Sequence, residues 1–182
     1  MGTGDIAQHT PCRGLLLSPV SRTPPTDSRP IGMFDSGFGG LTVARATIDL
    51  LPVEDLVYLG DTARYPYGSK SADEVVEHSL EIAEYLLDTF DVKLLVIACN
   101  TATAAGLDHL RDELPVPVMG VIEPGVRATL SATETGRVAV IGTVGTMATG
   151  AYDTAFGKID ASVTVVSCAC PGFVEFVERG NT

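Results

Sequence analysis

A cysteine followed by two polar residues, Cys99, Asn100 and Thr101, is the segment best suited to chemistry. The apolar run 94–98 before it predicts a strand buried on both faces, and the residues after it indicate the start of a helix. Cys99 is therefore expected at the carboxyl end of a parallel strand, where open α/β sheets bind ligands. The helix N-terminus should favour a thiolate and offer N–H groups to an anion. The alternative is an inert, buried cysteine that packs as a small hydrophobic residue.

Polar residues also follow the other strands predicted in the first half of the chain: Asp35 with Ser36, Gly60 with Asp61, and Glu123. The carboxyl ends of the strands in a doubly wound sheet share one edge, so these segments should converge with Cys99 on one crevice. Asp35 could orient Cys99 there or remove its proton. A thiol and a carboxylate in this arrangement suit proton transfer as well as acyl transfer.

Three loops allow both a structural and a ligand-binding interpretation. Residues 35–40, Asp-Ser-Gly-Phe-Gly-Gly, form either a flexible turn or a loop whose backbone approaches a ligand; they match neither the P-loop nor the dinucleotide motif. Residues 65–68, Tyr-Pro-Tyr-Gly, form either an aromatic turn or a lid. Thr143 and Thr146 either cap a helix or hold a carboxylate at its start.

The composition favours small-molecule chemistry. The 182 residues are 45% hydrophobic, which is enough for a substantial core, and the net charge of -11 argues against binding to nucleic acid or to an anionic membrane. The four cysteines lack the paired spacing of a zinc site and indicate cytosolic thiols, so a cytoplasmic location is expected. They are Cys12, Cys99, Cys168 and Cys170. No cofactor motif is found, and His78 and His109 are expected on solvated helix faces.

Strands and helices alternate from Pro30 onward. Strands are predicted over 31–34, 55–59, 94–98, 116–122, 138–142 and 163–167. Helices are predicted over about 41–51 and 72–90, then ending near 114, 132 and 156, with the start of one more after Pro171. This alternation is typical of βαβ units, and it predicts an α/β fold with mainly parallel, doubly wound sheets.

The chain is expected to contain a leader and two domains. Residues 1–29 are rich in proline and show no periodicity, which predicts a disordered leader, and the apolar run 15–17 is too short for a signal peptide. The Pro-Gly pair at 124–125 resembles a hinge. We therefore expect a first α/β domain over 30–123 and a second over 124–182, with a cleft between them. The second domain is expected to be truncated, because no terminating element follows its last predicted helix.

Five motifs, in order and with similar intervals, resemble the glutamate racemase family within the aspartate/glutamate racemase superfamily. They are Ile-Gly-x-Phe-Asp-Ser-Gly-x-Gly-Gly-Leu-Thr-Val (31–43), Gly-Asp-x-x-Arg-x-Pro-Tyr-Gly (60–68), Ala-Cys-Asn-Thr-Ala (98–102), Gly-Val-Ile-Glu-Pro (120–124) and Ile-Gly-Thr (141–143). The resemblance runs from about Pro30 to the last residue and corresponds to the N-terminal two-thirds of the family chain.

The resemblance implies a cofactor-independent isomerase that interconverts L- and D-glutamate, with the D-isomer going to peptidoglycan. Family members use two cysteines on opposite faces of the substrate. By motif match Cys99 is the first of them, and Asp35 is the carboxylate that assists it. Glu178 falls where the family has a glutamate near the second cysteine. The substrate-binding residues carry over to Asp35, Ser36, Tyr67, Gly68, Asn100, Thr101, Thr143 and Thr146.

One family feature is missing. The second cysteine of the family lies in a Gly-Cys-Thr-His segment, and this chain has no such segment. Cys168 and Cys170 are the only late alternatives, and Cys170-Pro171 matches a family Cys-Pro that is not the second base. We therefore predict that this polypeptide alone does not racemise glutamate.

Because the Cα proton is far less acidic than a thiol, the site must exclude water and stabilise negative charge with fixed donors, without a metal or pyridoxal group.

Two other interpretations remain open. Related racemases act on aspartate or hydantoins with the same two-thiol logic, and the loop glycines do not fix the length of the substrate side chain. The chain could also be a non-catalytic glutamate-binding remnant that keeps half of a site. In each case the expected partner is a small molecule, with neither nucleic acid nor a membrane involved, and the resemblance allows for a homodimer.

Overall fold

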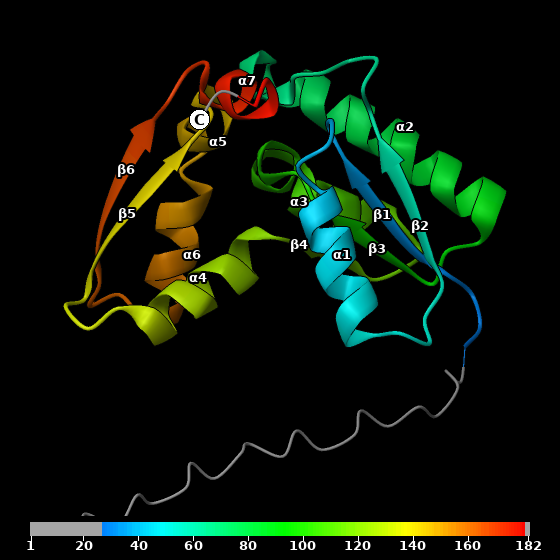
Figure 1. Cartoon of the computed structure of the whole chain (residues 1–182), viewed down its shortest axis with the longest axis horizontal. Coiled ribbons are helices and arrows are strands. Elements are labelled where there is room, and N and C mark those ends of the chain that lie inside the picture. Colours follow the sequence, from blue (N-terminus) through cyan, green and yellow to red (C-terminus); the bar gives the residue numbers. More distant parts are fainter. Residues whose placement is uncertain (1–26, 181–182) are drawn as a thin grey trace, which may run out of the picture.

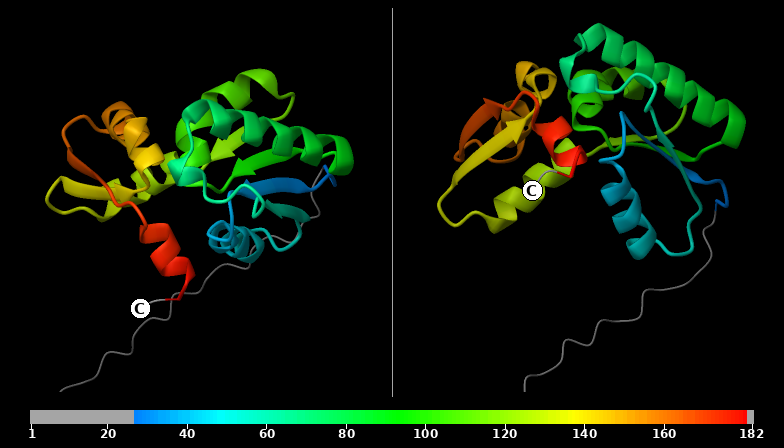
Figure 2. Two further views of the ribbon diagram at one scale, coloured as in Figure 1. Left: turned by 90° about the horizontal axis from the view of Figure 1, so that it is seen from above. Right: turned by 45° about the horizontal axis from the view of Figure 1, so that its top comes forward.

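The structure is a computed structural model, and it describes residues 27–180 apart from the side chain of Glu178. It contains two sheets, which lie beside each other with the last helix at the gap between them (Figures 1 and 2). The first sheet has the order β2-β1-β3-β4 and consists of β1 (Ile31–Asp35), β2 (Leu56–Gly60), β3 (Leu94–Ile97) and β4 (Val118–Gly120). The second pairs β5 (Arg137–Gly142) with β6 (Thr164–Ala169). Every strand pair is parallel, which confirms the predicted α/β fold.

Helices cover both faces of the first sheet. They are α1 (Leu41–Leu50) on one face, and α2 (Ala72–Phe90) and α3 (Asn100–Glu113) on the other. The central strand β1 is buried along its whole length, and its successive side chains point to opposite faces. Met33 packs with Ala44 of α1, whereas Phe34 belongs to the larger core formed with α2 and α3. This doubly wound arrangement fixes the carboxyl ends of β1 and β3 side by side.

Among residues 27–180, helices cover only one face of the second sheet. Its inner face packs against α4 (Ile122–Ala132) and α6 (Ala151–Ile159), around Val126 and Phe156. On its outer face the cross-strand pairs Ala139–Val166 and Ile141–Cys168 are exposed. Parallel sheets normally bury both faces, so this apolar surface is unusual for the fold.

The region around the predicted hinge is helical. β4 is shorter than the predicted strand 116–122, and α4 already begins at Ile122, so Pro124 and Gly125 lie in its first turn. Proline is tolerated there because the first N–H groups of a helix have no intrahelical partner. The Pro-Gly pair is thus part of a helix, and the expected boundary at 123/124 lies in the first turn of α4; the division into two domains stays a prediction.

The Thr-rich segment after β5 forms two helices instead of one. α5 (Val144–Ala148) ends before Gly150, which adopts a left-handed conformation with φ of 63°, and α6 follows directly. Glycine takes this conformation without steric cost, so it separates the helices. The last helix, α7 (Phe173–Glu178), begins close to the predicted position after Pro171.

Most of the predicted leader, residues 1–26, lies outside the described residues. Residues 27–29 are attached to the rest of the chain, because the Lys93 ammonium donates to the Asp27 carbonyl at 2.6 Å and the Arg29 guanidinium lies 3.4 Å from the Asp91 carboxylate. Within residues 27–180, no helix combines the length and the hydropathy that crossing a bilayer requires.

A capping box at the start of α2 offers a stability test. The Ser71 hydroxyl accepts from the Glu74 N–H at 3.3 Å, and the Glu74 carboxylate accepts from the Ser71 N–H at 3.0 Å. Ser71→Ala should lower the free energy of unfolding by about 1 kcal/mol, as loss of an N-cap usually does. Urea unfolding measures this loss. The exposed Ser131→Ala on α4 serves as the control, and an equal change in both variants would contradict the role of the cap.

Candidate functional site

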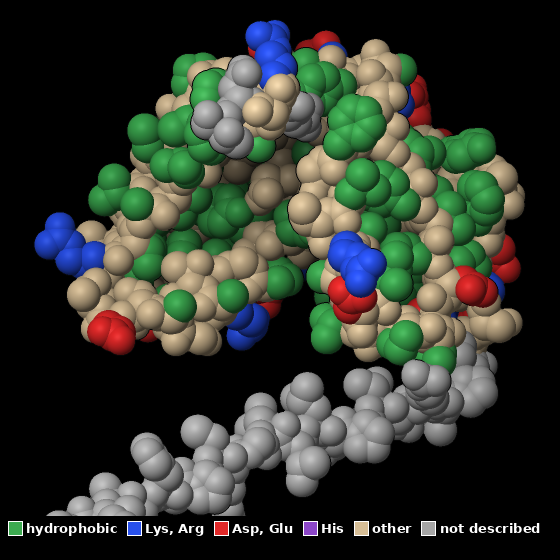
Figure 3. All heavy atoms as spheres, viewed as in Figure 1, with side chains coloured by type: hydrophobic (Ala, Val, Ile, Leu, Met, Phe, Trp, Pro, Cys, Tyr) green, Lys and Arg blue, Asp and Glu red, His purple; other side chains and the backbone are tan. Residues whose placement is uncertain are grey.

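A cavity of about 380 Å³ opens between the two sheets, at the carboxyl ends of β1 and β3. Its volume is in the range of small-molecule sites. The surface is hollowed in the same region, with hydrophobic side chains around the hollow (Figure 3). The predicted site residues that line the cavity are Asp35, Ser36, Tyr67, Gly68, Cys99, Asn100, Thr101 and Thr143. Thr146 does not line it, and the prediction for Glu178 concerns a side chain outside the described part of the structure.

Cys99 lies at the N-cap of α3, directly after β3. Its sulfur accepts from the Ala102 N–H at 3.4 Å, and its thiol donates to the Ser36 hydroxyl at 3.4 Å. Only 5% of the residue is exposed. Burial raises the pKa of the Cys99 thiol, and the charge of Asp35 raises it further, whereas the two hydrogen bonds lower it. Burial of Cys99 therefore favours the neutral thiol over the expected thiolate.

Asp35 is buried beside Cys99 and is held by the glycine loop. Its carboxylate accepts from the Gly40 N–H at 2.9 Å. A Cβ atom on Gly40 would lie 2.6 Å from the Asp35 Cβ and 2.9 Å from the Ala98 Cβ, so the loop can approach β1 and β3 only with glycine there. The hydrogen-bond partner of the thiol is Ser36, and Asp35 acts on it through its charge. The assisting role of Asp35 stays a prediction.

Burial, Asp35 and Cys99 also affect the pKa of Tyr58 of β2. Its hydroxyl donates to the Gly37 carbonyl at 3.4 Å, beneath the glycine loop. Burial, followed by the charges of Asp35 and Cys99, raises the pKa of Tyr58 to about 12. Tyr58 therefore remains a neutral hydroxyl at physiological pH and supports the loop as a hydrogen-bond donor.

Tyr67 is fixed by a network that the sequence pattern did not identify. Its hydroxyl donates to Asp61 at 2.5 Å, and Arg64 donates to the same oxygen at 2.6 Å. Burial, followed by the Asp61 carboxylate, raises the pKa of Tyr67. Arg64 also contacts Glu81 and, at 3.1 Å, the His78 ring, which lies 5.7 Å from the Tyr67 ring. His78 is thus half-buried against the site, not solvated as predicted. For the Tyr67 network, the order Asp-x-x-Arg-x-Pro-Tyr at 61–67 was the signal that the sequence offered.

Three threonine hydroxyls connect the two sheets. Thr101 at the start of α3 lies 3.0 Å from Thr143 and 3.1 Å from Thr146, and the latter two are 2.9 Å apart. Thr143 caps α5 by accepting from the Thr146 N–H at 3.1 Å, which confirms the capping interpretation. A Cβ atom on Gly68 would lie 2.6 Å from Thr143, so Gly68 permits close packing of the aromatic turn on α5. Thr146 supports this junction from behind the cavity.

Two further polar groups lie at the cavity. The amide oxygen of Asn100 accepts from the Tyr152 hydroxyl at 2.6 Å, which links the start of α3 to α6. Glu175 of α7 lines the cavity opposite β1, together with Cys170. The sequence analysis named Glu178 and did not identify Glu175. Burial raises the pKa of the Cys170 thiol, whereas Cys168 is exposed and does not line the cavity.

The arrangement combines a protonated thiol, a carboxylate, several hydroxyls and the N-terminus of a fourteen-residue helix. Such a site can bind an anion at the start of α3 and move a proton at the sulfur of Cys99. In the described part of the chain, no three His, Cys, Asp or Glu side chains gather in a way that could hold a metal ion.

The raised pKa of Cys99 predicts slow alkylation. The thiolate is the nucleophile, and at any pH below the pKa a raised value leaves a smaller thiolate fraction. At pH 7.5 iodoacetamide should therefore modify Cys99 at least about tenfold more slowly than the exposed Cys168, and the rate at Cys99 should rise about tenfold per pH unit up to its pKa. Mass spectrometry of the two cysteine peptides measures both rates. Equal rates at both cysteines would contradict the burial of the Cys99 thiol.

Comparison with known proteins identifies relatives along most of the chain. The family model of Asp/Glu/Hydantoin racemase matches residues 42–182. Glutamate racemase of Bacillus cereus is 54% identical over 154 residues, which cover 85% of this chain and 57% of the relative. Among solved structures, glutamate racemase isoform RacE1 from Bacillus anthracis aligns with a TM-score of 0.80 and 46% identity, over 83% of this chain and 56% of that chain.

A further solved structure contains a ligand. Glutamate racemase from Francisella tularensis in complex with D-glutamate aligns with a TM-score of 0.77 and 38% identity, over 84% of this chain and 57% of that chain. The chain thus spans little more than half the length of the relatives that it matches.

Proposed function

Because the chain belongs to the Asp/Glu/Hydantoin racemase family, we propose that its cavity is the Cys99 side of a glutamate-racemising site. The observation that carries the proposal is the position of the Cys99 sulfur. It lies at a helix N-terminus, in a cavity shared with Asp35, Ser36 and Thr101. The relative from Francisella tularensis binds D-glutamate, and this supports glutamate as the ligand.

In the proposed mechanism Cys99 exchanges a proton with Cα of glutamate on one face of the substrate. The substrate carboxylate binds at the N-terminus of α3, and the hydroxyls of Ser36, Thr101 and Thr143 supply fixed donors. The raised pKa of the free thiol fits this scheme if the substrate ammonium group binds beside Asp35. A positive charge at that place would favour the thiolate only when substrate is present.

We propose that the 182-residue chain does not racemise glutamate by itself. Racemisation needs a second acid on the opposite face of Cα, and the family's Gly-Cys-Thr-His segment does not occur in the sequence. A single base still permits exchange of the Cα hydrogen with solvent. Such exchange should be confined to the enantiomer whose Cα hydrogen faces Cys99.

The remaining expectations belong to the same proposal. They are a cytoplasmic protein, D-glutamate production for peptidoglycan, catalysis without a metal or other cofactor, domains over 30–123 and 124–182, and a homodimer. The physical basis for the absence of a cofactor is that helix N–H groups and hydroxyls already supply donors for the developing negative charge.

Titration calorimetry with glutamate and a coupled assay for D-glutamate test the proposal. We expect saturable binding of glutamate, at least about tenfold weaker binding of aspartate because its shorter side chain cannot reach the same partners, and no turnover. Absence of glutamate binding by the folded chain would overturn the proposal. Preferential binding of aspartate would assign the site to the related racemases, and robust turnover would contradict the inactivity of the chain.

A further inference from the structure

Two helices of the second half of the chain contact the start of α3, directly after Cys99. Tyr152, in the first turn of α6, donates its hydroxyl hydrogen to the Asn100 amide oxygen at 2.6 Å. Thr146 of α5 contacts the next residue, Thr101, at 3.1 Å. Asn100 and Thr101 line the Cys99 cavity, whereas Tyr152 and Thr146 do not. Two hydroxyls outside the cavity therefore hold two side chains that line it.

The Tyr152 side chain is anchored well enough to act as a fixed donor. Its ring packs against the core around Val126 and Phe156, and Phe156 lies one turn further along α6. Burial raises the pKa of the Tyr152 hydroxyl, so the hydroxyl keeps its proton at physiological pH. A neutral phenol donates one hydrogen bond, and the amide oxygen of Asn100 receives it.

This contact fixes which end of the Asn100 amide meets a ligand. An asparagine side chain carries an acceptor oxygen and a donor NH2 group, and a half-turn about its last bond exchanges their places. Because the oxygen is engaged by Tyr152, the NH2 group points away from α6. Within residues 27–180 no protein group accepts a hydrogen bond from this nitrogen, so its hydrogens are available to a ligand.

A donor at this place suits an acidic ligand. Among the described residues, no lysine, arginine or histidine lines the cavity, and its carboxylates, Asp35 and Glu175, repel an anion. The partners of a ligand carboxylate at the start of α3 are therefore neutral donors, namely backbone N–H groups, hydroxyls and the Asn100 amide. An amide turned the other way would place its oxygen against the carboxylate and replace an attraction by a repulsion.

We propose that Tyr152 is a positioning residue, which holds the Asn100 amide with its NH2 group toward the bound carboxylate. The inference rests on the proposed function, because it takes the ligand to be glutamate bound at the start of α3. Tyr152 does not touch the ligand. It orders Asn100 before binding, so that the ligand does not have to immobilise this side chain.

A double-mutant cycle in titration calorimetry with glutamate tests the proposal. Asn100→Ala should weaken binding at least about tenfold, since it removes a hydrogen bond to a charged group. Tyr152→Phe should weaken it about three- to tenfold, the usual effect of having to order one side chain on binding. In the Asn100→Ala chain the same change should alter the affinity less than about twofold. An equal loss in both backgrounds, or no loss in either, would overturn the proposal.

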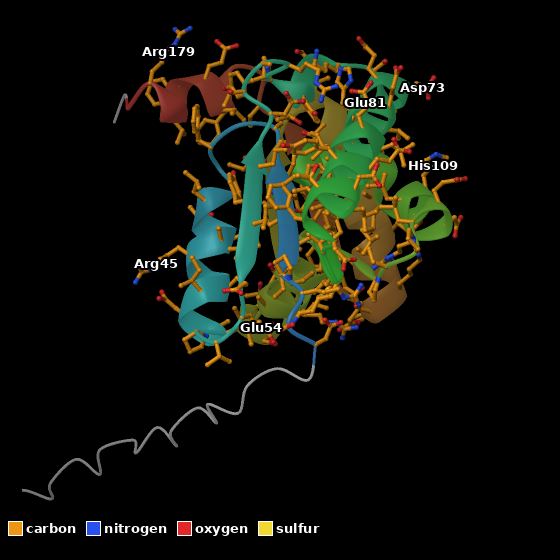
Figure 4. All side chains as sticks on the ribbon, turned by 90° about the vertical axis from the view of Figure 1, so that its right-hand side faces the viewer. Arg45, Glu54, Asp73, Glu81, His109 and Arg179 are labelled. Carbon is orange, nitrogen blue, oxygen red and sulfur yellow. The ribbon has the colours of Figure 1, made fainter. Side chains whose placement is uncertain are left out.

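Tyr85→Phe is the matched control. Tyr85 is 52% exposed on α2, one turn after Glu81, and α2 and α6 lie on opposite sides of the molecule (Figures 1 and 4). The chemical change is the same, so glutamate binding should be unaltered. Circular dichroism of each variant excludes a folding defect. A loss equal to that of Tyr152→Phe would contradict a specific role of Tyr152.

NMR of the Asn100 side chain tests the positioning without a ligand. Its amide signals are identified by their loss in Asn100→Ala, and ¹⁵N relaxation gives their order parameter. We expect a value of about 0.85, as in a rigid backbone, and a value below about 0.6 in Tyr152→Phe. Equal values in the two chains would overturn the proposal, whether or not glutamate binds. The expected fall in a chain that does not bind glutamate would retain the role of Tyr152 and reject the proposed function instead.

Discussion

Cys99→Ser is expected to lower the rate of Cα hydrogen exchange in glutamate by about 10²–10⁴-fold, the usual contribution of a general base. Serine preserves the N-cap that Cys99 provides, because its hydroxyl also accepts from the N–H of residue 102. A hydroxyl is far less acidic than a thiol. The serine side chain therefore does not form the anion that would remove the Cα proton. Proton NMR of glutamate in deuterated water measures the rate.

Two controls make this result specific. Cys168→Ser removes an exposed thiol that does not line the cavity, so exchange should be unchanged. Circular dichroism and thermal unfolding of Cys99→Ser should match those of the unaltered chain, which excludes a folding defect. Exchange that persists in folded Cys99→Ser would assign the base to another group.

The second large effect is expected in the core beneath the site. Phe34 is fully buried in β1 and precedes Asp35, and its ring belongs to the core shared with α2 and α3. Phe34→Ala should lower the free energy of unfolding by about 3–5 kcal/mol, because it removes apolar contacts and leaves a cavity. Native domains are stable by only about 5–15 kcal/mol, so this variant should be close to unfolding at 37 °C. Urea unfolding followed by circular dichroism measures the loss.

The same substitution four residues later is the matched control. Phe38 lies in the glycine loop and is 60% exposed. Phe38→Ala should change the free energy of unfolding by no more than about 0.5 kcal/mol, as is usual for surface positions. A loss below 1 kcal/mol for Phe34→Ala would mean that the face of the first sheet toward α2 and α3 is not packed as described.

The order of the elements was predictable because the periodicity of the sequence is strong. The apolar run before Cys99 indicated β3, and a nineteen-residue amphipathic segment indicated α2 with its true limits. The start of α4 was missed because Pro124 and Gly125 are usually read as breakers, and only their location in the first turn makes them compatible with a helix. The break at Gly150 was missed for the opposite reason, since one glycine in a helical pattern seldom identifies a positive φ.

The convergence of the candidate site was also predictable, since parallel strands deliver Asp35 and Cys99 to one edge of a sheet. The protonation state of Cys99 was not, because its burial depends on residues far away in the sequence, such as Phe34 and Tyr67 of the same core. The partnership of Tyr67 with Asp61 depends likewise on the path of the loop between them. Such contacts have no periodic signature, so only the tertiary structure reveals them.

The exposed outer face of β5 and β6 was not predicted from the sequence. Alternation along the two strands places Ile141 and Val166 on a bare apolar face. Such a face favours association with other apolar surfaces. Measurements of binding and exchange therefore require dilute protein and a check of its oligomeric state.

Proton transfer by Cys99 on one face of glutamate is tested most directly by proton NMR in deuterated water. L- and D-glutamate are incubated separately with the 182-residue chain. We predict loss of the Cα proton signal for one enantiomer only, with retention of its configuration. No exchange in either enantiomer, with glutamate shown to be bound, would contradict the claim.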